Sequence, residues 1–136
     1  MDVEEAIEVQ AAGEPPSAVT ELFLAGCTVP GLATLSLQLV PFLNLRSLSL
    51  NCCKLGSLQS FPALPNLRCL ELADNQLTGN LEPLYGASLL SLRELNLADN
   101  LIENLGLASL SRLPSLRRLD LSNNPAASAA NYLTSC

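Results

Sequence analysis

One pattern of eleven residues recurs five times along this chain, and it constrains the fold more than any other feature. The pattern is L-x-x-L-x-L-x-x-N/C-x-L, with conservative replacements at a few positions. Its copies are VTELFLAGCTV (19–29), LRSLSLNCCKL (45–55), LRCLELADNQL (67–77), LRELNLADNLI (92–102) and LRRLDLSNNPA (116–126). Their starts are 26, 22, 25 and 24 residues apart. This regularity predicts an array of similar structural units.

Within each copy, leucines at positions 4 and 6 alternate with other residues, which is the period of a β-strand. Positions 3, 5 and 7 then point outward. One copy alone leaves its leucine face unburied, so neighbouring copies must stack to form a core. The ninth residue lies where the strand turns away, and its side chain is expected to bond buried backbone groups; it is Cys27, Cys53, Asn75, Asn100 or Asn124.

The predicted fold class is α/β, a leucine-rich-repeat solenoid with a curved parallel β-sheet on the concave side and helical or 3₁₀ turns on the convex side. Two connecting segments have apolar spacing that favours such a turn, and each ends at a proline. One carries Leu58, Phe61, Leu64 and then Pro65, and the other carries Leu105, Leu107, Leu110, Leu113 and then Pro114.

The sequence divides into three parts. Residues 1–18 are expected to form an N-terminal helical cap, because Asp2 and Glu5 have the spacing of a helix cap and Gly13 precedes two prolines. Residues 19–126 hold the five repeats. Residues 127–136 are interpreted as the start of a truncated C-terminal cap, so that the chain is part of a longer protein or a partner covers this end.

Charge is distributed unevenly along the chain. The net charge is -6, but five of the thirteen acidic residues lie in the first fourteen positions. The remainder has eight acidic and seven basic residues, which argues against direct binding of nucleic acid. No apolar run approaches the roughly 20 residues of a membrane helix, and the start lacks the features of a secretory signal. We therefore expect a soluble, intracellular protein with no membrane contact.

Catalytic signals are weak, and we expect no enzyme activity, metal or cofactor. The chain has no histidine, the usual base and the commonest metal ligand. Its five cysteines form no C-x-x-C or zinc spacing and are expected to stay reduced. Asp74 and Asp99 are candidates for a carboxylate pair, but both occupy Ala-Asp-Asn turns at the same repeat position, which favours a structural role.

Outward positions of stacked strands become columns across the sheet. Position 2 gives a row of arginines at Arg46, Arg68, Arg93 and Arg117. Two interpretations of this row stay open. The arginines either cover leucines with their stems and pair with nearby acids, or they await anions from a partner. The first is favoured because acids lie only three positions away along the chain.

The concave face is the candidate site for a protein partner, since such arrays recognise ligands there. Phe23 is open to two roles, packing against the cap or contacting the partner, and packing is favoured. The predicted contact residues are Phe23, Ser49, Arg68, Glu71, Arg93, Asn96, Arg118 and Asp120.

Three stretches resemble a known family: PSAVTELFL, LRCLELADNQLTGNLEPL and SLRELNLADNLIENL. They are similar to the leucine-rich-repeat domain of the acidic leucine-rich nuclear phosphoprotein 32 family, over about residues 16–124. The resemblance implies a non-enzymatic protein of the nucleus and cytoplasm that binds proteins including histones, inhibits type-2A phosphatase and influences transcription and apoptosis. The acidic tail of that family is absent from these residues, and histone chaperoning in the family depends on that tail.

An alternative class also fits the sequence. The segment NNPAASAANYLTS has the Asn-Pro and Tyr spacing of caps in spliceosomal A-prime-type, dynein-light-chain-type and phosphatase-regulator-type repeat proteins. A protein of that class would be a scaffold subunit of a stable assembly.

Overall fold

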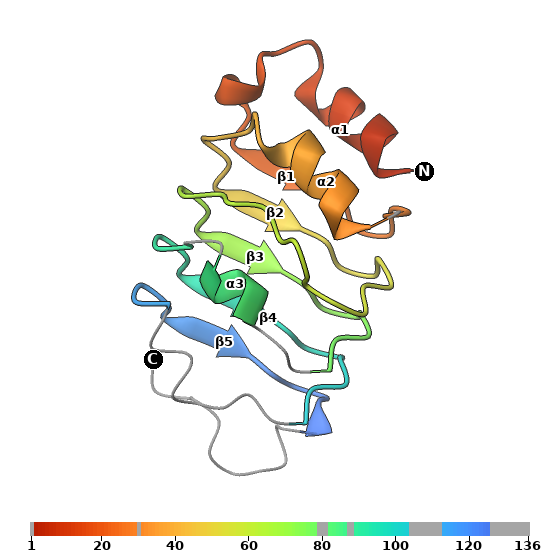
Figure 1. Cartoon of the computed structure of the whole chain (residues 1–136), viewed down its shortest axis with the longest axis vertical. Helices are drawn as coiled ribbons and strands as arrows, with labels where there is room; N and C mark the ends of the chain where they lie inside the picture. Colours follow the sequence, from red (N-terminus) through yellow and green to blue (C-terminus); the bar gives the residue numbers. More distant parts are fainter. Residues whose placement is uncertain (1, 30, 79–81, 87–88, 104–112, 126–136) are drawn as a thin grey trace.

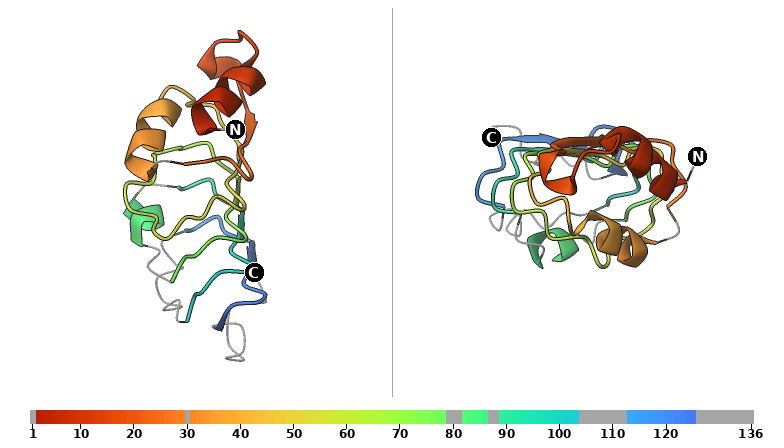
Figure 2. Two further views of the ribbon diagram at one scale, coloured as in Figure 1. Left: turned by 90° about the vertical axis from the view of Figure 1, so that its right-hand side faces the viewer. Right: turned by 90° about the horizontal axis from the view of Figure 1, so that it is seen from above.

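In the computed structural model, five short parallel strands of the described residues form a sheet in sequence order (Figure 1). The structure describes residues 2–29, 31–78, 82–86, 89–103 and 113–125. The strands are β1 (Glu21–Phe23), β2 (Ser47–Ser49), β3 (Cys69–Glu71), β4 (Glu94–Asn96) and β5 (Arg118–Asp120). The sheet lines one side of a stack of coils and the connecting segments line the other (Figure 2). The predicted α/β solenoid is therefore confirmed.

The register of the sheet is the one that the repeat predicts. The central leucine of each strand pairs with that of the next, in the order Leu22, Leu48, Leu70, Leu95 and Leu119. The first four of these leucines are buried and the fifth is partly buried. The leucines at position 6 are fully buried in every copy. Because burying one leucine contributes about 1.5–3 kcal/mol, these two columns supply much of the stability of the core.

Two α-helices lie on the convex side, opposite the sheet (Figure 2). They are α2 (Leu32–Leu39), which follows the first strand, and α3 (Glu82–Gly86), which follows the third. Helix α2 buries Leu32, Leu35 and Leu39 against the core. Neither helix lies in the two segments that apolar spacing favoured. The segment that includes Leu105, Leu107 and Leu110 lies outside the described residues.

The prediction of a helical or 3₁₀ segment between Leu58 and Leu64 is wrong. All three apolar residues of this segment are buried as expected, but the chain there is irregular. It makes one turn, in which the Phe61 N–H donates to the Leu58 carbonyl at 3.1 Å. Ser60 has a left-handed φ of 66° and Pro62 has no N–H, so a helix cannot continue through them.

Helix α1 (Val3–Ala11) covers the first repeat. Asp2 caps it by accepting a hydrogen bond from the Glu5 N–H at 2.9 Å, as the spacing of these two residues predicts. Val3, Ala6 and Ile7 are buried in the core. A short 3₁₀ helix, η1 (Pro16–Ala18), then leads into β1.

The side chain of Gln10, near the end of α1, binds the backbone of the first strand. Its amide nitrogen donates to the Phe23 carbonyl at 2.6 Å, and its amide oxygen accepts from the Phe23 N–H at 2.7 Å. Strand β1 is the edge of the sheet, so these are groups that no neighbouring strand satisfies. The candidate C-terminal cap at 127–136 lies outside the described residues.

The ninth residues of the repeats join each coil to the one before it. Oδ1 of Asn75 accepts from the N–H groups of Cys53 at 3.1 Å and Leu55 at 2.9 Å, and its Nδ2 donates to the carbonyls of Leu50 and Leu72. Similar bonds recur at Asn100 and Asn124, and the Cys53 thiol lies 3.2 Å from the Leu24 carbonyl oxygen. The predicted role of this position is therefore confirmed at these residues.

Candidate protein-binding face

The outward side chains of the five strands form two columns. Pairing across the sheet aligns position 3 as Glu21, Ser47, Cys69, Glu94 and Arg118. Position 5 aligns as Phe23, Ser49, Glu71, Asn96 and Asp120. The structure therefore brings together five of the eight predicted contact residues in the position 5 column and places Arg118 in the column beside it. It places Arg68 and Arg93 one residue before their strands.

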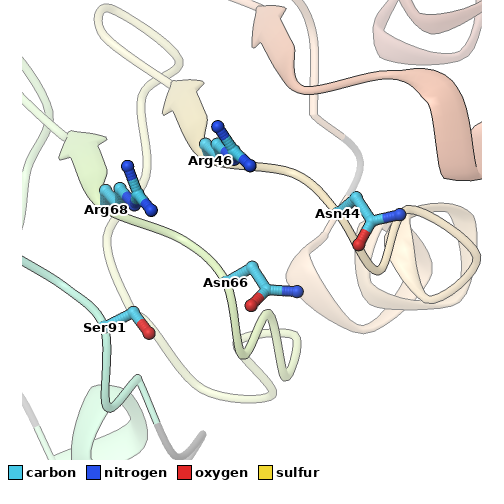
Figure 3. A pocket seen from close by; sticks show the side chains of 5 residues that line it. All are labelled: Asn44, Arg46, Asn66, Arg68 and Ser91. Carbon is cyan, nitrogen blue, oxygen red and sulfur yellow. The ribbon is translucent and has the colours of Figure 1, made fainter.

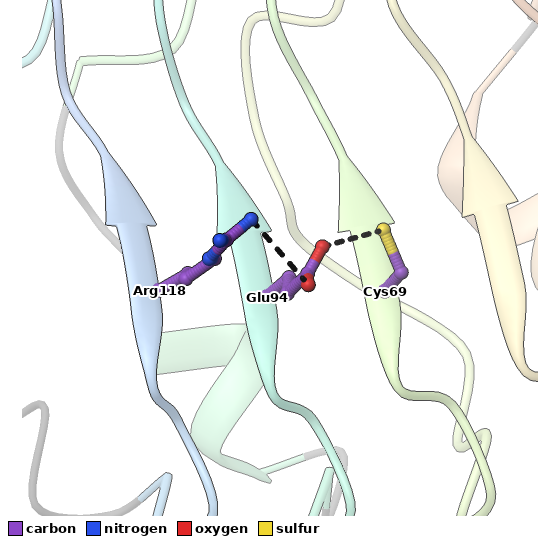
Figure 4. Close-up of polar contacts among 3 residues, drawn as sticks. All are labelled: Cys69, Glu94 and Arg118. Carbon is purple, nitrogen blue, oxygen red and sulfur yellow. Dashed lines mark hydrogen bonds and ion pairs between the residues drawn. The ribbon is translucent and has the colours of Figure 1, made fainter. Parts of the chain in front are cut away.

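A chain of polar contacts crosses three strands in the position 3 column (Figure 4). The Glu94 carboxylate lies between Arg118, with a nitrogen 4.0 Å from Oε1, and Cys69, with its sulfur 3.9 Å from Oε2. Both charged side chains are more than half exposed, so this ion pair contributes about 0–1 kcal/mol. Its main effect is to fix where the carboxylate lies on the face.

The Cys69 thiol has a raised pKa. Partial burial is the largest cause, and the carboxylates of Glu94 and Glu71 add to it because they repel a thiolate. At neutral pH this cysteine is therefore protonated and a poor nucleophile. The structure assigns it no catalytic chemistry, only a place on the face beside two acids.

The Asp120 carboxylate is hydrogen-bonded to Ser122, two residues further along the chain. Its Oδ1 accepts hydrogen bonds from the hydroxyl of Ser122 and, at 2.9 Å, from the Ser122 N–H. Both bonds favour the carboxylate, the hydroxyl more than the N–H, and they lower the pKa of Asp120. The group is therefore a fixed negative charge at physiological pH.

Two members of the predicted contact set, Phe23 and Ser49, have an exposure that the sequence did not predict. The Phe23 side chain is 57% exposed, so the favoured interpretation that it packs against the cap is not what the structure shows. Its contact with α1 is made by its backbone instead. Ser49 lies in the outward column but is only 5% exposed, so it offers a partner little surface. Phe23 is thus the available apolar contact in this column.

The eighth residues of the repeats form the turns at the ends of the strands. All five have a left-handed φ, between 57° and 74°; they are Gly26, Cys52, Asp74, Asp99 and Asn123. Asp99 accepts a hydrogen bond from Asn123 at 2.9 Å, and Asp74 lies 3.7 Å from the Cys52 thiol. Aspartate and asparagine tolerate this conformation better than most residues. The two aspartates are therefore turn residues, as their repeat position predicts.

The arginine row was expected to pair with nearby acids, but its side chains are arranged differently. Among the residues that the structure describes, the side chains of Arg46, Arg68, Arg93 and Arg117 make no hydrogen bond or ion pair. All four are exposed. The described arginine that does pair with an acid is Arg118, in the neighbouring column. The favoured pairing of the row with nearby acids is thus not observed.

A small polar pocket of about 150 Å³ adjoins this row (Figure 3). It is lined by Asn44, Arg46, Asn66, Arg68 and Ser91. Asn44, Asn66 and Ser91 were not among the residues predicted from the sequence. The signal was present, because each lies two residues before an arginine of the row.

The sheet, its leucine columns and its ninth-residue hydrogen bonds together define a leucine-rich-repeat protein. Residues 65–125 match the family described as Leucine rich repeat, and residues 43–86 match Leucine Rich repeats (2 copies). The two matches together span residues 43–125, which is more than half of the chain. The chain belongs to the leucine-rich-repeat family.

Within this family, the chain is related to the acidic leucine-rich nuclear phosphoprotein 32 proteins, which confirms the resemblance seen in the sequence. Family member A from Drosophila melanogaster is 36% identical over 131 residues, which cover 96% of this chain and 48% of that protein. Related protein 1 from Caenorhabditis elegans is 38% identical over 111 residues, or 81% and 47% of the two chains. Related protein 1 from Oryza sativa subsp. japonica is 38% identical over 95% of this chain and 28% of its own length. The chain spans about half the length of the fly and nematode relatives.

Among solved structures, an internalin from Listeria monocytogenes matches 90% of this chain and 56% of its own chain, with 18% identity and a TM-score of 0.39. A match at that score adds nothing to the assignment. Within the described part of the chain, no group of three or more cysteine, aspartate or glutamate side chains could hold a metal ion. No helix in that part is long and apolar enough to cross a membrane.

Proposed function

We propose that this chain is a non-enzymatic domain that binds a protein partner on the concave face of its sheet. The contacts are the predicted set, with Phe23 as apolar contact, Glu71 and Asp120 as acids, Asn96 as amide, and Arg68, Arg93 and Arg118 as flanking cations. Ser49 contributes to packing within the column. The observation that supports this most directly is the register, which aligns outward side chains of five repeats on one surface.

The charge pattern of this face suits a partner that carries basic groups. Glu71, Glu94 and Asp120 lie on neighbouring strands, and the hydrogen bonds of Asp120 keep its carboxylate ionised. Complementary charges speed association and select partners more than they add affinity. A basic protein segment lying across β3, β4 and β5 would meet all three acids.

The relatives suggest which partner to test first. They are named as acidic nuclear phosphoproteins, so we propose a nuclear location, with the cytoplasm as a second site. Histone binding, inhibition of type-2A phosphatase and effects on transcription and apoptosis are the finer activities that the resemblance implies. Histones fit the acidic columns because they are basic.

The test is binding of core histones, measured by fluorescence anisotropy alongside thermal melting. The variant Glu71→Lys with Asp120→Asn changes the charge of the face by three units and keeps an acceptor for Ser122. We expect binding about tenfold weaker or more, which corresponds to about 1.4 kcal/mol. The control is Glu14→Lys with Glu103→Gln, which changes the net charge equally at two exposed positions outside the columns. Equal weakening in both variants would reject the concave-face site, and absence of histone binding in the wild type would reject the histone assignment.

A further inference from the structure

Backbone hydrogen bonds fix the four arginines of the row in their order across the sheet. The Arg46 carbonyl accepts from the N–H groups of Arg68 at 2.7 Å and Cys69 at 3.0 Å. The Arg68 carbonyl likewise accepts from Arg93, and the Arg93 carbonyl accepts from Arg117, each at 2.8 Å. Each arginine is therefore hydrogen-bonded to the next, and their Cα atoms are about 4.8 Å apart, the spacing of strands in a sheet. The row cannot slip in register.

Within the residues that the structure describes, the guanidinium groups of this row have no hydrogen-bond or ion-pair partner. Each side chain is exposed and makes no hydrogen bond or ion pair in the described part of the chain. Figure 3 shows Arg46 and Arg68 extending in parallel from neighbouring strands. Like charges held this close repel, and a bound anion would relieve that repulsion.

A second polar row lies beside the first. Nδ2 of Asn44 donates to the Ser17 carbonyl and Nδ2 of Asn66 donates to the Leu43 carbonyl, both at 2.9 Å. Ser115 makes the corresponding bond to the Leu90 carbonyl at 2.7 Å. The bonds of Asn44 and Asn66 fix two of the side chains that line the pocket of about 150 Å³. A water molecule occupies about 30 Å³ of liquid, so the pocket has room for a carboxylate with some of its hydration.

We infer that the arginine row binds an extended acidic peptide segment of a partner protein. Four arginines at about 4.8 Å intervals span about 14 Å. In an extended peptide, side chains on one face recur about every 6.6 Å, so acids at positions i, i+2 and i+4 span about 13 Å. An alternating acidic segment therefore matches the length of the row. Arginine suits this role because its planar group binds carboxylates with two parallel hydrogen bonds.

The length of the arginine row, about 14 Å, favours an extended acidic peptide over other anions. One phosphate group is small compared with 14 Å and would reach at most two neighbouring arginines, so a single phosphorylated residue would leave half of the row unpaired. Nucleic acid is disfavoured because residues 15–136 have a net charge of -1 and acids of the sheet lie beside the row.

The inference rests on the proposed protein-binding function, since Arg68 and Arg93 belong to both sets of residues. In this inference the arginine row binds an acidic segment of the partner. Glu71 and Asp120 bind a different, basic segment. One protein with neighbouring basic and acidic segments would satisfy both surfaces. The two assignments can be separated because Glu71 and Asp120 lie outside the row and Arg46 lies outside the predicted contact set.

The experiment measures direct binding of a fluorescein-labelled peptide of nine alternating glutamate and serine residues by fluorescence anisotropy. The wild-type protein is expected to bind it, more weakly at higher salt because the contact is electrostatic. The variant Arg46→Gln with Arg68→Gln keeps most of each side-chain stem and should bind about tenfold more weakly. The matched control is Lys54→Glu, which lowers the net charge by the same two units at an exposed position outside the row and outside the predicted contacts, and it should change binding less than about twofold.

Three results would overturn the inference: no peptide binding by the wild type, equal weakening in the double variant and the Lys54→Glu control, or tighter binding of a single-phosphoserine peptide or an oligothymidine of similar length. The histone variant, Glu71→Lys with Asp120→Asn, should keep peptide binding. If histones fail to bind while the peptide binds normally, the acidic-column proposal fails alone. If the peptide fails while histone binding persists, the inference fails alone.

Discussion

Oδ1 of Asn75 lies 3.1 Å from the backbone nitrogen of Cys53 and accepts its hydrogen bond, so the ninth residues of two successive repeats are directly joined. Asn75 is 7% exposed and Cys53 is 6% exposed. Water therefore has little access to replace this bond. The same amide also binds four further backbone groups, which makes the asparagine the connection between two coils.

Replacing this asparagine should destabilise the fold strongly. Asn75→Ala leaves the N–H groups of Cys53 and Leu55 and the Leu50 carbonyl without this partner, whereas the Leu72 carbonyl keeps its bond from Asn100. A buried polar group without a partner costs about 1–3 kcal/mol, so we expect a loss of about 3–5 kcal/mol in the free energy of unfolding, measured in urea. The control is Asn66→Ala, which removes one exposed bond and should cost about 1 kcal/mol or less. Similar losses in both variants would contradict the buried role.

The left-handed turn of the first repeat predicts a difference between two glycines. Gly26 has a φ of 74°, whereas Gly56 lies outside the left-handed region, and an added Cβ would meet nothing within 4 Å at either position. Gly26→Ala should therefore cost about 1 kcal/mol through backbone strain alone. Gly56→Ala should be neutral or slightly stabilising, because alanine restricts the unfolded chain. Thermal melting of the two variants tests this, and equal melting temperatures would be inconsistent with the turn.

The environment of Cys69 predicts slow thiol chemistry. Burial and the carboxylates of Glu94 and Glu71 raise its pKa, so little thiolate exists at pH 8. Glu94→Gln removes one negative charge, should lower the pKa and should speed reaction of Cys69 with iodoacetamide, as measured by mass spectrometry of the labelled peptides. Cys52, which lies beside Asp74 instead, is the internal control and should react at an unchanged rate. An unchanged rate at Cys69 would refute the assigned cause.

The raised pKa of Cys69 also makes the stability of the fold depend on pH. Because folding raises the pKa of Cys69, the folded state favours the protonated thiol. This contribution is fully present below the ordinary cysteine pKa and is lost as the pH rises through the raised one. Unfolding in urea at neutral and alkaline pH should show less of this loss in Glu94→Gln than in the wild type.

Asp120 predicts an effect at the acidic end of the pH scale. Its pKa is lowered by the Ser122 hydroxyl and N–H, so its contribution to stability is present above the ordinary aspartate pKa and is lost as the pH falls through the lowered one. Ser122→Ala removes the hydroxyl bond and should raise the pKa of Asp120, followed by carbon-13 NMR of the carboxyl group. The control is Ser57→Ala, at an exposed turn outside the sheet, which should leave the pKa of Asp120 unchanged. A pKa of Asp120 unchanged by the substitution would exclude Ser122 as the cause.

The repeated part of the fold was predictable because it depends on local alternation. Leucines two residues apart define each strand, and the spacing of copies defines the pairing, so the columns followed from the sequence alone. The connecting segments were less predictable. Helix α2 begins after Gly31 with no side-chain cap and no acid in its first turn, so the usual signals of a helix start are missing.

The positions of the candidate site residues on the sheet were predictable from the sequence, but their exposure and their side-chain partners were not. The sequence places Ser49, Phe23 and the arginine row at outward or edge positions, yet it does not determine which of them neighbouring side chains cover. Ser49 proved to be buried, Phe23 proved to be exposed, and the arginines proved to be unpaired. These properties depend on side-chain conformations across several strands, which a linear pattern does not encode.

The contact of Gln10 with Phe23 has a consequence for self-association. An open β-strand at a sheet edge is a template on which a second molecule can add its own strand, and such growth leads to aggregates and fibrils. The carboxamide of Gln10 occupies both backbone groups of Phe23 that an incoming strand would need. The Gln10 side chain thus removes these two groups of β1 from pairing with the strand of another molecule.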